Sequence, residues 1–209
     1  MILEIEKERI LQNLIRQLSS FFDISAFEKR SLISLHDSVL KRCENCFFHN
    51  ENKYYKKEGD VYFNPFHSAQ YTIYLYYFSN SIFKNENNRI LSDKIYYLNK
   101  IMNACDLYYE IALPDIFMLD HPVGSVMGRA TYGNYFSFGQ NCSVGNNKGI
   151  FPAIGEYVKM SANSMILGNS NIGDNVTIAA GACVKDQDIP QNSLVFGSSP
   201  NLIIKPKKV

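Results

Sequence analysis

The chain has 209 residues, of which 46% are hydrophobic and 20% charged, and its formal net charge is +1. This is the composition of an ordinary globular protein, and a net charge so close to zero excludes a general electrostatic attraction to nucleic acid or to an anionic membrane. The chain shows neither a basic-then-apolar leader nor an apolar run long enough for a membrane span, so we expect a cytoplasmic protein without membrane insertion.

The first half of the chain predicts four helices, because apolar residues recur there at helical spacing. The expected ranges are 2–22, 26–46, 67–84 and 88–105. Phe27 belongs to the apolar face of the second helix, and a polar loop at residues 50–60 follows that helix. We interpret the aromatic stretch Tyr71–Phe78 in the third helix as core or subunit contact rather than as a ligand site.

The five cysteines do not form a recognisable metal or redox motif. Cys43 and Cys46 have CxxC spacing, but no second CxxC and no paired histidines follow. We therefore expect reduced, half-buried thiols and no metal.

From Leu113 onward the apolar period changes to six. The regular hexads open on Ile154, Met160, Ile166, Ile172, Ile178 and Val184, and the same period runs upstream through Leu119, Tyr132, Phe138, Val144 and Ile150. A fixed six-residue period with an inward aliphatic residue and small residues behind it indicates a parallel β-helix, in which three hexads make one triangular coil. We expect four to five coils before about residue 196.

These patterns predict an α+β chain with three parts. Residues 1–110 form a helical domain, residues 111–197 form the β-helix, and residues 198–209 form a basic tail that includes Lys205, Lys207 and Lys208.

The hexad period is interrupted twice, and His121 lies at the first interruption. Eight positions separate Leu119 from Met127, and His121 is the only one of the four histidines inside the repeats. A polar Asp-His pair at a widened corner is poorly placed for packing, and a neutral imidazole can accept a proton near pH 7. We take His121 as a candidate general base; a surface histidine at a turn is the alternative. The second interruption is an insertion at Phe151–Ala153.

A general base needs an orienting partner, and Asp106, Asp115 and Asp120 are the acidic candidates. Asp120 adjoins His121, but neighbours on a strand point to opposite faces, which makes direct pairing awkward. Asp106 lies 15 residues upstream, just under one coil, so it can approach His121 from the adjacent layer.

At these residues the chain resembles serine acetyltransferase, within the hexapeptide-repeat acyltransferases. The family has an aspartate 15 residues before the histidine of an L-D-H-A-T-G motif, and here Asp106 precedes His121 in L-D-H-P-V-G by the same distance. F-N-P-F-H-S-A-Q-Y is similar to a family segment before the last helices, and I-P-Q-N-S-L-V-F-G-S-S-P is similar to its closing coil. The resemblance covers about residues 60–205.

The resemblance implies a left-handed β-helix, a homotrimer, acetyl-CoA as donor and a small-molecule hydroxyl acceptor. Whether trimers pair into hexamers stays open. His121 would deprotonate the acceptor, Asp106 would hold the imidazole, and Asp120 would contact the acceptor, with no metal and no acyl-enzyme. The implied CoA contacts are Gly145, Ala162, Ala180, Lys185 and Lys205. Corner packing is the alternative reading of both alanines.

The acceptor site departs from the family pattern. Where the family has an Arg-His pair that binds the serine carboxylate, this chain has Ile150 and Phe151, and only Lys148 is near enough to substitute. Arg129 follows Gly128 where the family has a glutamate. We therefore expect an acceptor site with Arg129, Lys148 and Phe151, and an acceptor that is serine, a seryl conjugate or a sugar hydroxyl of polysaccharide synthesis.

Two other functions remain open from the sequence. A catalytically silent scaffold or partner protein would also show a degraded acceptor site. A β-helix metalloenzyme of the carbonic anhydrase kind would need several histidines in the repeats, and His121 stands alone there.

Overall fold

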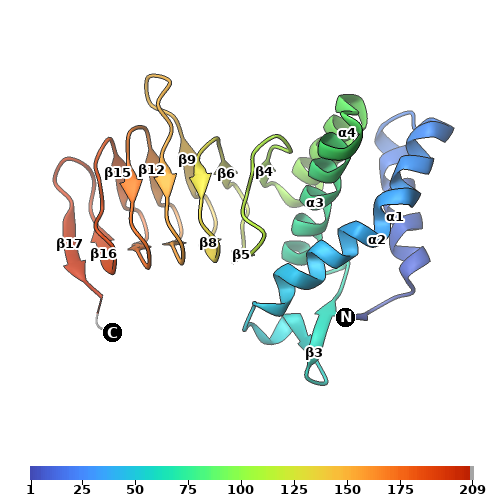
Figure 1. Cartoon of the computed structure of the whole chain (residues 1–209), viewed down its shortest axis with the longest axis horizontal. Helices are drawn as coiled ribbons and strands as arrows, with labels where there is room; N and C mark the ends of the chain where they lie inside the picture. The colour runs from blue at the N-terminus through green and yellow to red at the C-terminus, as the bar shows by residue number, and fades with distance from the viewer. Residues whose placement is uncertain (208–209) are drawn as a thin grey trace. The chain divides into compact units, whose positions relative to one another are not determined.

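A computed structural model describes residues 1–207 of the chain (Figure 1). The chain divides into two compact units, Met1–Asn103 and Ala104–Val209. The boundary falls earlier than residue 110, because Asp106–Leu107 already pairs with a strand of the β-helix. Within residues 1–207, no helix combines the length and the apolar character that crossing a bilayer requires.

The first unit contains the four predicted helices. They are α1 (Lys7–Phe21), α2 (Ala26–Phe48), α3 (Ser68–Glu86) and α4 (Arg89–Asn103). A small sheet and a short helix, which the sequence pattern does not predict, accompany them: β1 (Ile2–Leu3), β2 (Lys56–Lys57), β3 (Asp60–Phe63) and the 3-10 turn Lys53–Tyr55. The first helix starts at Lys7 rather than at residue 2, because Ile2–Leu3 pairs with β3 instead.

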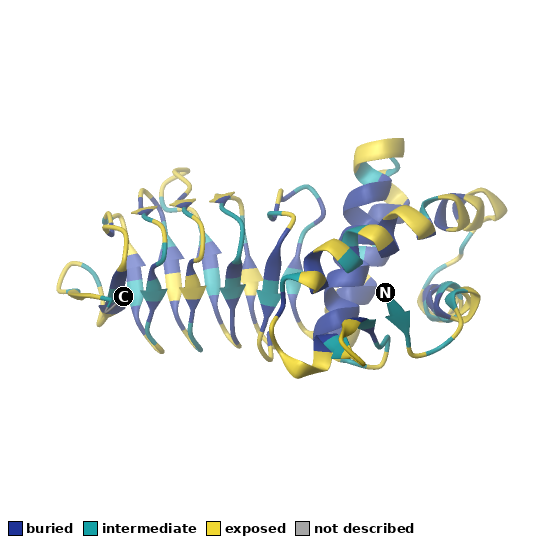
Figure 2. Ribbon diagram, turned by 60° about the horizontal axis from the view of Figure 1, so that its bottom comes forward, coloured by how far each residue is buried: buried dark blue, intermediate teal, exposed yellow. Residues whose placement is uncertain are grey.

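Helix α3 is the core of this unit. Figure 2 shows it buried along most of its length, and every residue from Tyr71 to Phe78 is at most 4% exposed. This supports the interpretation of the aromatic stretch as core. Cys43 and Cys46 are fully buried rather than half-buried, and burial raises the pKa of the Cys43 thiol well above its usual value.

The prediction that Phe27 faces the core is wrong, since its side chain is 60% exposed. It lies in the first turn of α2, where Ser25 and Glu28 form a capping box, and the Arg30 guanidinium lies 5.9 Å from the centre of its ring.

The second unit is a triangular parallel β-helix, and its three faces are three sheets. The first face contains β5 (Phe117–Leu119), β8 (Phe136–Phe138), β11 (Lys159–Met160), β14 (Thr177–Ile178), β16 (Ser193–Phe196) and β17 (Ile203–Pro206). The second face contains β4 (Asp106–Leu107), β6 (Val126–Met127), β9 (Ser143–Gly145), β12 (Met165–Leu167) and β15 (Cys183–Lys185). The third face contains β7 (Thr131–Tyr132), β10 (Ala153–Ile154) and β13 (Asn171–Ile172).

The six-residue period has the expected physical cause. The leading residues of the hexads point inward and stack in columns, and all of those from Leu113 to Val184 except Ile150 are at most 8% exposed. Each buried aliphatic side chain contributes about 1.5–3 kcal/mol relative to an exposed one. The predicted β-helix is thus confirmed.

Ile150 breaks this rule, because its side chain is 50% exposed. It closes a turn with Asn147, in which each backbone N–H donates to the other residue's carbonyl at 3.0 Å, and Lys148 and Gly149 at the tip have φ of +51° and +80°. The loop that contains the insertion therefore spans residues 146–152 and stands out from the coils in Figure 1. It does not start at Phe151 as the period suggested.

The end of the described chain folds back onto the last coil. Strand β17 pairs antiparallel with β16, with Leu194 opposite Lys205, and so covers the edge of the first face. Lys208 and Val209 of the predicted basic tail lie outside the described residues.

Candidate active site

In each coil the chain turns from the first face to the second, and we call this turn the first corner. In the first of these turns, residues 120–125, the corner is wider than in the coils that follow. Leu119 pairs with Phe138 and Val126 pairs with Ser143, so this turn contains two residues more than the same turn one coil later. The next turns are tight and pass through Asn141, Asn163 and Gly181, each at positive φ, which Asn and Gly tolerate best. The sequence-based prediction of a widened corner is confirmed.

His121 lies on this widened corner with its side chain 91% exposed. Its φ is +51°, so the residue has left the strand, and Nε2 lies 3.8 Å from Oδ1 of Asp120. The strand argument against a contact between these neighbours therefore fails, because it holds only for extended backbone. The widened corner therefore exposes an imidazole with a carboxylate beside it, in a position that an acceptor molecule can reach.

Asp106 lies beside the same corner in the preceding coil. Its backbone N–H donates to the carbonyl of Ser125 at 2.8 Å, and the carbonyl of Ala104 accepts from Gly124 at 2.8 Å. The one-coil spacing thus places Asp106 one layer from His121, as the sequence suggests.

Ala162 and Ala180 belong to later copies of the first corner. Asn163 donates to the carbonyl of Gln140, and Gly181 donates to the carbonyl of Ala162, both at 2.9 Å. Ala162 and Ala180 are therefore the small members of a column that starts with Val123 and Gln140. A Cβ on Gly139 would lie 3.4 Å from the Ala162 nitrogen, which shows how closely the coils approach there. Small residues therefore satisfy the packing and also leave the backbone of this edge accessible.

Gly145 and Lys185 lie in a different row, at the far edge of the second face. Leu167 pairs with both of them, from the coil between. Lys205 lies on the first face, where its Nζ is 5.8 Å from the centre of the Phe196 ring. Within one chain, the two lysines are therefore not on the same face.

Arg129, Lys148 and Phe151 lie at the second corner, where the chain turns from the second face to the third. Arg129 is exposed and pairs with Glu110, whose carboxylate lies 3.6 Å from its guanidinium. Phe151 is 44% exposed on the inserted loop. A single chain therefore does not bring these predicted acceptor residues together with His121, since the second face separates the two corners.

Asp186 anchors the inserted loop. One carboxylate oxygen accepts from the Asn169 backbone N–H at 2.9 Å, and the other accepts a short hydrogen bond from the Asn147 side chain. These hydrogen bonds, together with the nearby Lys185 and Lys148, hold the pKa of Asp186 below its usual value, so the anchor is ionised at neutral pH.

We expect Asp186→Ala to loosen the loop without unfolding the coils. Amide hydrogen exchange at Asn147 and Ile150, whose N–H groups close the loop, should accelerate about three- to tenfold, because a charge-assisted hydrogen bond is lost. Asp188→Ala is the matched control: Asp188 accepts from Asn171 on the third face. Equal rates of amide hydrogen exchange at Asn147 and Ile150 in the two variants would show that Asp186 does not anchor the loop.

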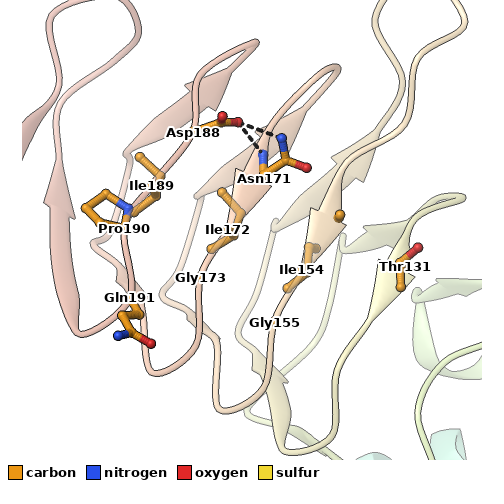
Figure 3. Close-up of a pocket in the computed structure, with 11 residues that line it drawn as sticks. Thr131, Ile154, Gly155, Asn171, Ile172, Gly173, Asp188, Ile189, Pro190 and Gln191 are labelled. Carbon is orange, nitrogen blue, oxygen red and sulfur yellow. Dashed lines mark hydrogen bonds between the residues drawn. The ribbon is translucent and has the colours of Figure 1, made fainter.

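A groove of about 710 Å³ lies elsewhere, on the outside of the third face (Figure 3). Residues of the third-face strands and of the segment Asp188–Gln191 line it, with Asn171 and Asp188 at one side. None of the predicted site residues lines this groove, so it does not belong to the corner that carries His121. Among residues 1–207, no group of three or more His, Cys, Asp or Glu side chains is arranged to hold a metal ion.

The sequence reasoning missed Glu110 and Ser125. Glu110 precedes Arg129 by about one coil, so the repeat length itself was a signal for the ion pair. Ser125 is a buried polar residue in a column of small residues that also contains Cys142, Ser164 and Ala182.

The comparisons with known proteins point to serine acetyltransferases. The chain is 27% identical over 114 residues to a serine acetyltransferase of Synechococcus elongatus and 30% identical over 124 residues to serine acetyltransferase 2 of Arabidopsis thaliana. These matches cover 52% and 57% of this chain but only 46% and 38% of the two relatives. The chain thus matches less than half the length of either relative. No protein-family model matches the chain.

Solved structures confirm the fold over nearly the whole chain. The serine acetyltransferase of Brucella abortus superposes with a TM-score of 0.73 at 18% identity, covering 97% of this chain and 84% of that protein. A serine acetyltransferase in complex with CoA gives 0.69 at 15% identity, covering 95% of this chain and 84% of that one. The predicted architecture, a helical domain followed by a left-handed β-helix, is therefore confirmed.

Proposed function

We propose that the chain is an acetyl-CoA-dependent O-acetyltransferase that acts on a small hydroxyl acceptor, with His121 as general base. The observation that carries the proposal is the widened first corner. It exposes His121, brings Asp120 next to it and has Asp106 one coil away, in a chain similar to serine acetyltransferases.

The reaction needs one proton carrier. Nε2 of His121 takes the proton of the acceptor hydroxyl as its oxygen attacks the thioester carbonyl of acetyl-CoA. The C–S bond then breaks, the acetyl group stays on the acceptor as an ester, and the proton passes from His121 to the CoA sulfur. Asp106 orients the imidazole and stabilises its charged form. A positioned base of this kind contributes about 10²–10⁴ in rate.

Acetyl-CoA fits the first corner best along its column of small residues. Ala162 is half-buried and Ala180 exposed, so a ligand can reach the backbone of both turns. Gly145 and Lys185 form the next row across the second face, where the ammonium group of Lys185 suits a phosphate. Lys205, on the first face, would approach from the other side of the corner.

The acceptor is serine or another small compound that carries a hydroxyl group. The names of the relatives favour serine. The exposed Ile150 and Phe151 favour a seryl conjugate or a sugar, because they stand where an Arg-His pair would bind a carboxylate, and Arg129 already pairs with Glu110. Since His121 and this loop lie at opposite edges of the second face, a complete acceptor site requires a second copy of the chain. We therefore include a homotrimer in the proposal.

We place the protein in the cytoplasm, where acetyl-CoA is available. All five cysteines are free thiols, which suits a reducing compartment.

The proposal is tested by measuring thiol release from acetyl-CoA with serine, seryl conjugates and sugar nucleotides. We expect saturable release with at least one acceptor, and a mass in solution three times that of the chain. Absence of release with every acceptor, together with failure to bind CoA, would favour the silent scaffold instead. Efficient turnover of free serine would show that Ile150 and Phe151 do not exclude a carboxylate.

A further inference from the structure

A buried hydroxyl group supports the widened corner from inside the β-helix. Ser125 is 1% exposed, and its Oγ donates to the Gly139 carbonyl at 2.7 Å and accepts from the Cys142 N–H at 2.9 Å. Both partners belong to the next copy of the first corner. The side chain therefore ties the corner that carries His121 to the coil after it.

The backbone of Ser125 ties the same corner to the coil before it. Its carbonyl accepts from the Asp106 N–H at 2.8 Å, and its own N–H donates to the Pro122 carbonyl at 3.1 Å. Pro122 directly follows His121. One residue thus bonds to the strand that begins at Asp106 and to the turn that begins after His121.

The hydroxyl group is not needed for an ordinary turn of this β-helix. Ala182 occupies the equivalent position in a later coil, is 1% exposed, and makes the same turn through its N–H and the Ala179 carbonyl at 3.1 Å. Ser125 differs from Ala182 in the length of the turn to which it belongs. This turn, residues 120–125, has two extra residues and contains His121. Ser164 also places a buried hydroxyl group at this position, with its Oγ 3.7 Å from the Cys142 sulfur. What distinguishes Ser125 is that its hydroxyl group bridges the Gly139 carbonyl and the Cys142 N–H.

We propose that Ser125 is a positioning residue for the Asp106–His121 pair, an inference that rests on the proposed acetyltransferase function. Without its hydroxyl group, the Cys142 N–H and the Gly139 carbonyl lose their shared partner, and the corner relaxes relative to the following coil. Because the Ser125 backbone also bonds to Asp106, this movement reaches both members of the pair. A misplacement of about 1 Å in a catalytic group costs roughly 100-fold in rate.

The test compares Ser125→Ala with Ser164→Ala. Ser164 lies in the same column, is fully buried, and its Oγ is 3.7 Å from the Cys142 sulfur, but within the described residues no hydrogen bond joins it to the widened corner. We expect Ser125→Ala to lower kcat about 10- to 100-fold at unchanged KM for acetyl-CoA, and Ser164→Ala to change kcat less than about threefold. Ser125→Cys, which retains a weak donor and matches the cysteine at position 142, should recover part of the loss and remains informative if the alanine variant does not fold. Equal effects of the two alanine variants, or no recovery with cysteine, would overturn the proposal.

A second readout does not depend on turnover. The chain has only four histidines, so the imidazole proton resonances of His121 can be followed by NMR. Ser125→Ala should shift the His121 resonance and accelerate amide exchange at Asp106, whereas Ser164→Ala should leave both unchanged. If no acceptor is acetylated, the acetyltransferase proposal fails while this measurement still decides the positioning role. If both signals match the wild type, Ser125 does not position the pair, whatever the activity.

Discussion

Replacing His121 with alanine is expected to lower the rate of acetyl transfer by about 10²–10⁴-fold, the usual contribution of a positioned general base. CoA affinity should stay close to wild type, because the small residues of the proposed CoA column lie in later coils. The stability should also stay unchanged, since the side chain is 91% exposed and packs against little. Steady-state thiol release and CoA binding by calorimetry measure the two quantities separately.

The matched control is His49→Ala, at the C-terminal end of α2 in the other unit. It should leave the rate of acetyl transfer unchanged. Asp106→Asn should lower turnover with CoA affinity nearly intact, because the amide keeps the size of the carboxylate but cannot stabilise the imidazolium. Wild-type turnover in Asp106→Asn would remove this residue from the mechanism, and wild-type turnover in His121→Ala would remove the general base.

The β-helix could be predicted because each hexad shows its inward position through a single apolar residue. Each lead residue reports one inward position, so a slip in the period also locates a structural irregularity, as it did at His121. The period gave a wrong prediction at Ile150, which has the six-residue spacing of an inward residue but is half exposed. There the two-residue tip at Lys148 and Gly149 lets the chain turn back before it reaches the third face.

The contacts between coils could not be predicted in the same way. The Arg129–Glu110 pair and the Asp186–Asn147 anchor join residues in different coils, and insertions change the number of residues per coil. The spacing shows which residues share a corner, but the side-chain rotamers decide which of them meet. The acceptor residues illustrate the limit: the sequence assigns Arg129, Lys148 and Phe151 to one site but does not show that, within one chain, they lie at a different corner from His121.

The second large effect concerns stability rather than catalysis, and it arises at His36 in the helical unit. This side chain on α2 is 3% exposed, and its Nε2 has no hydrogen-bond partner in the structure. The ring stacks on Phe78 and meets Tyr74 edge-on, with centroid distances of 6.1 and 6.0 Å. Burial lowers the pKa of His36 from 6.5 to about 4; the nearby Asp37 and Glu8 act in the opposite direction, and Lys7 in the same direction.

The sign of the pH effect follows from this shift. His36 is neutral in the folded protein at pH 5, whereas in the unfolded chain it already binds a proton below pH 6.5, so folding must release that proton. The contribution of neutral, buried His36 to the stability of the folded protein is fully present above pH 6.5 and is lost as the pH falls toward 4. We expect the free energy of unfolding to fall by about 2–3 kcal/mol over this range.

The variant that isolates this effect is His36→Leu, which fills a similar volume without a titratable group. Nine of the 14 tyrosines lie in residues 1–103, so near-ultraviolet circular dichroism of the full chain follows the unfolding of the helical unit. Urea unfolding between pH 7.5 and 4 should show a smaller loss of stability in His36→Leu than in the wild type. The leucine variant should also be at least as stable at pH 7, because it removes a buried nitrogen that lacks a hydrogen-bond partner. Parallel pH profiles for the two proteins would show that other groups, and not His36, cause the acid sensitivity of this unit.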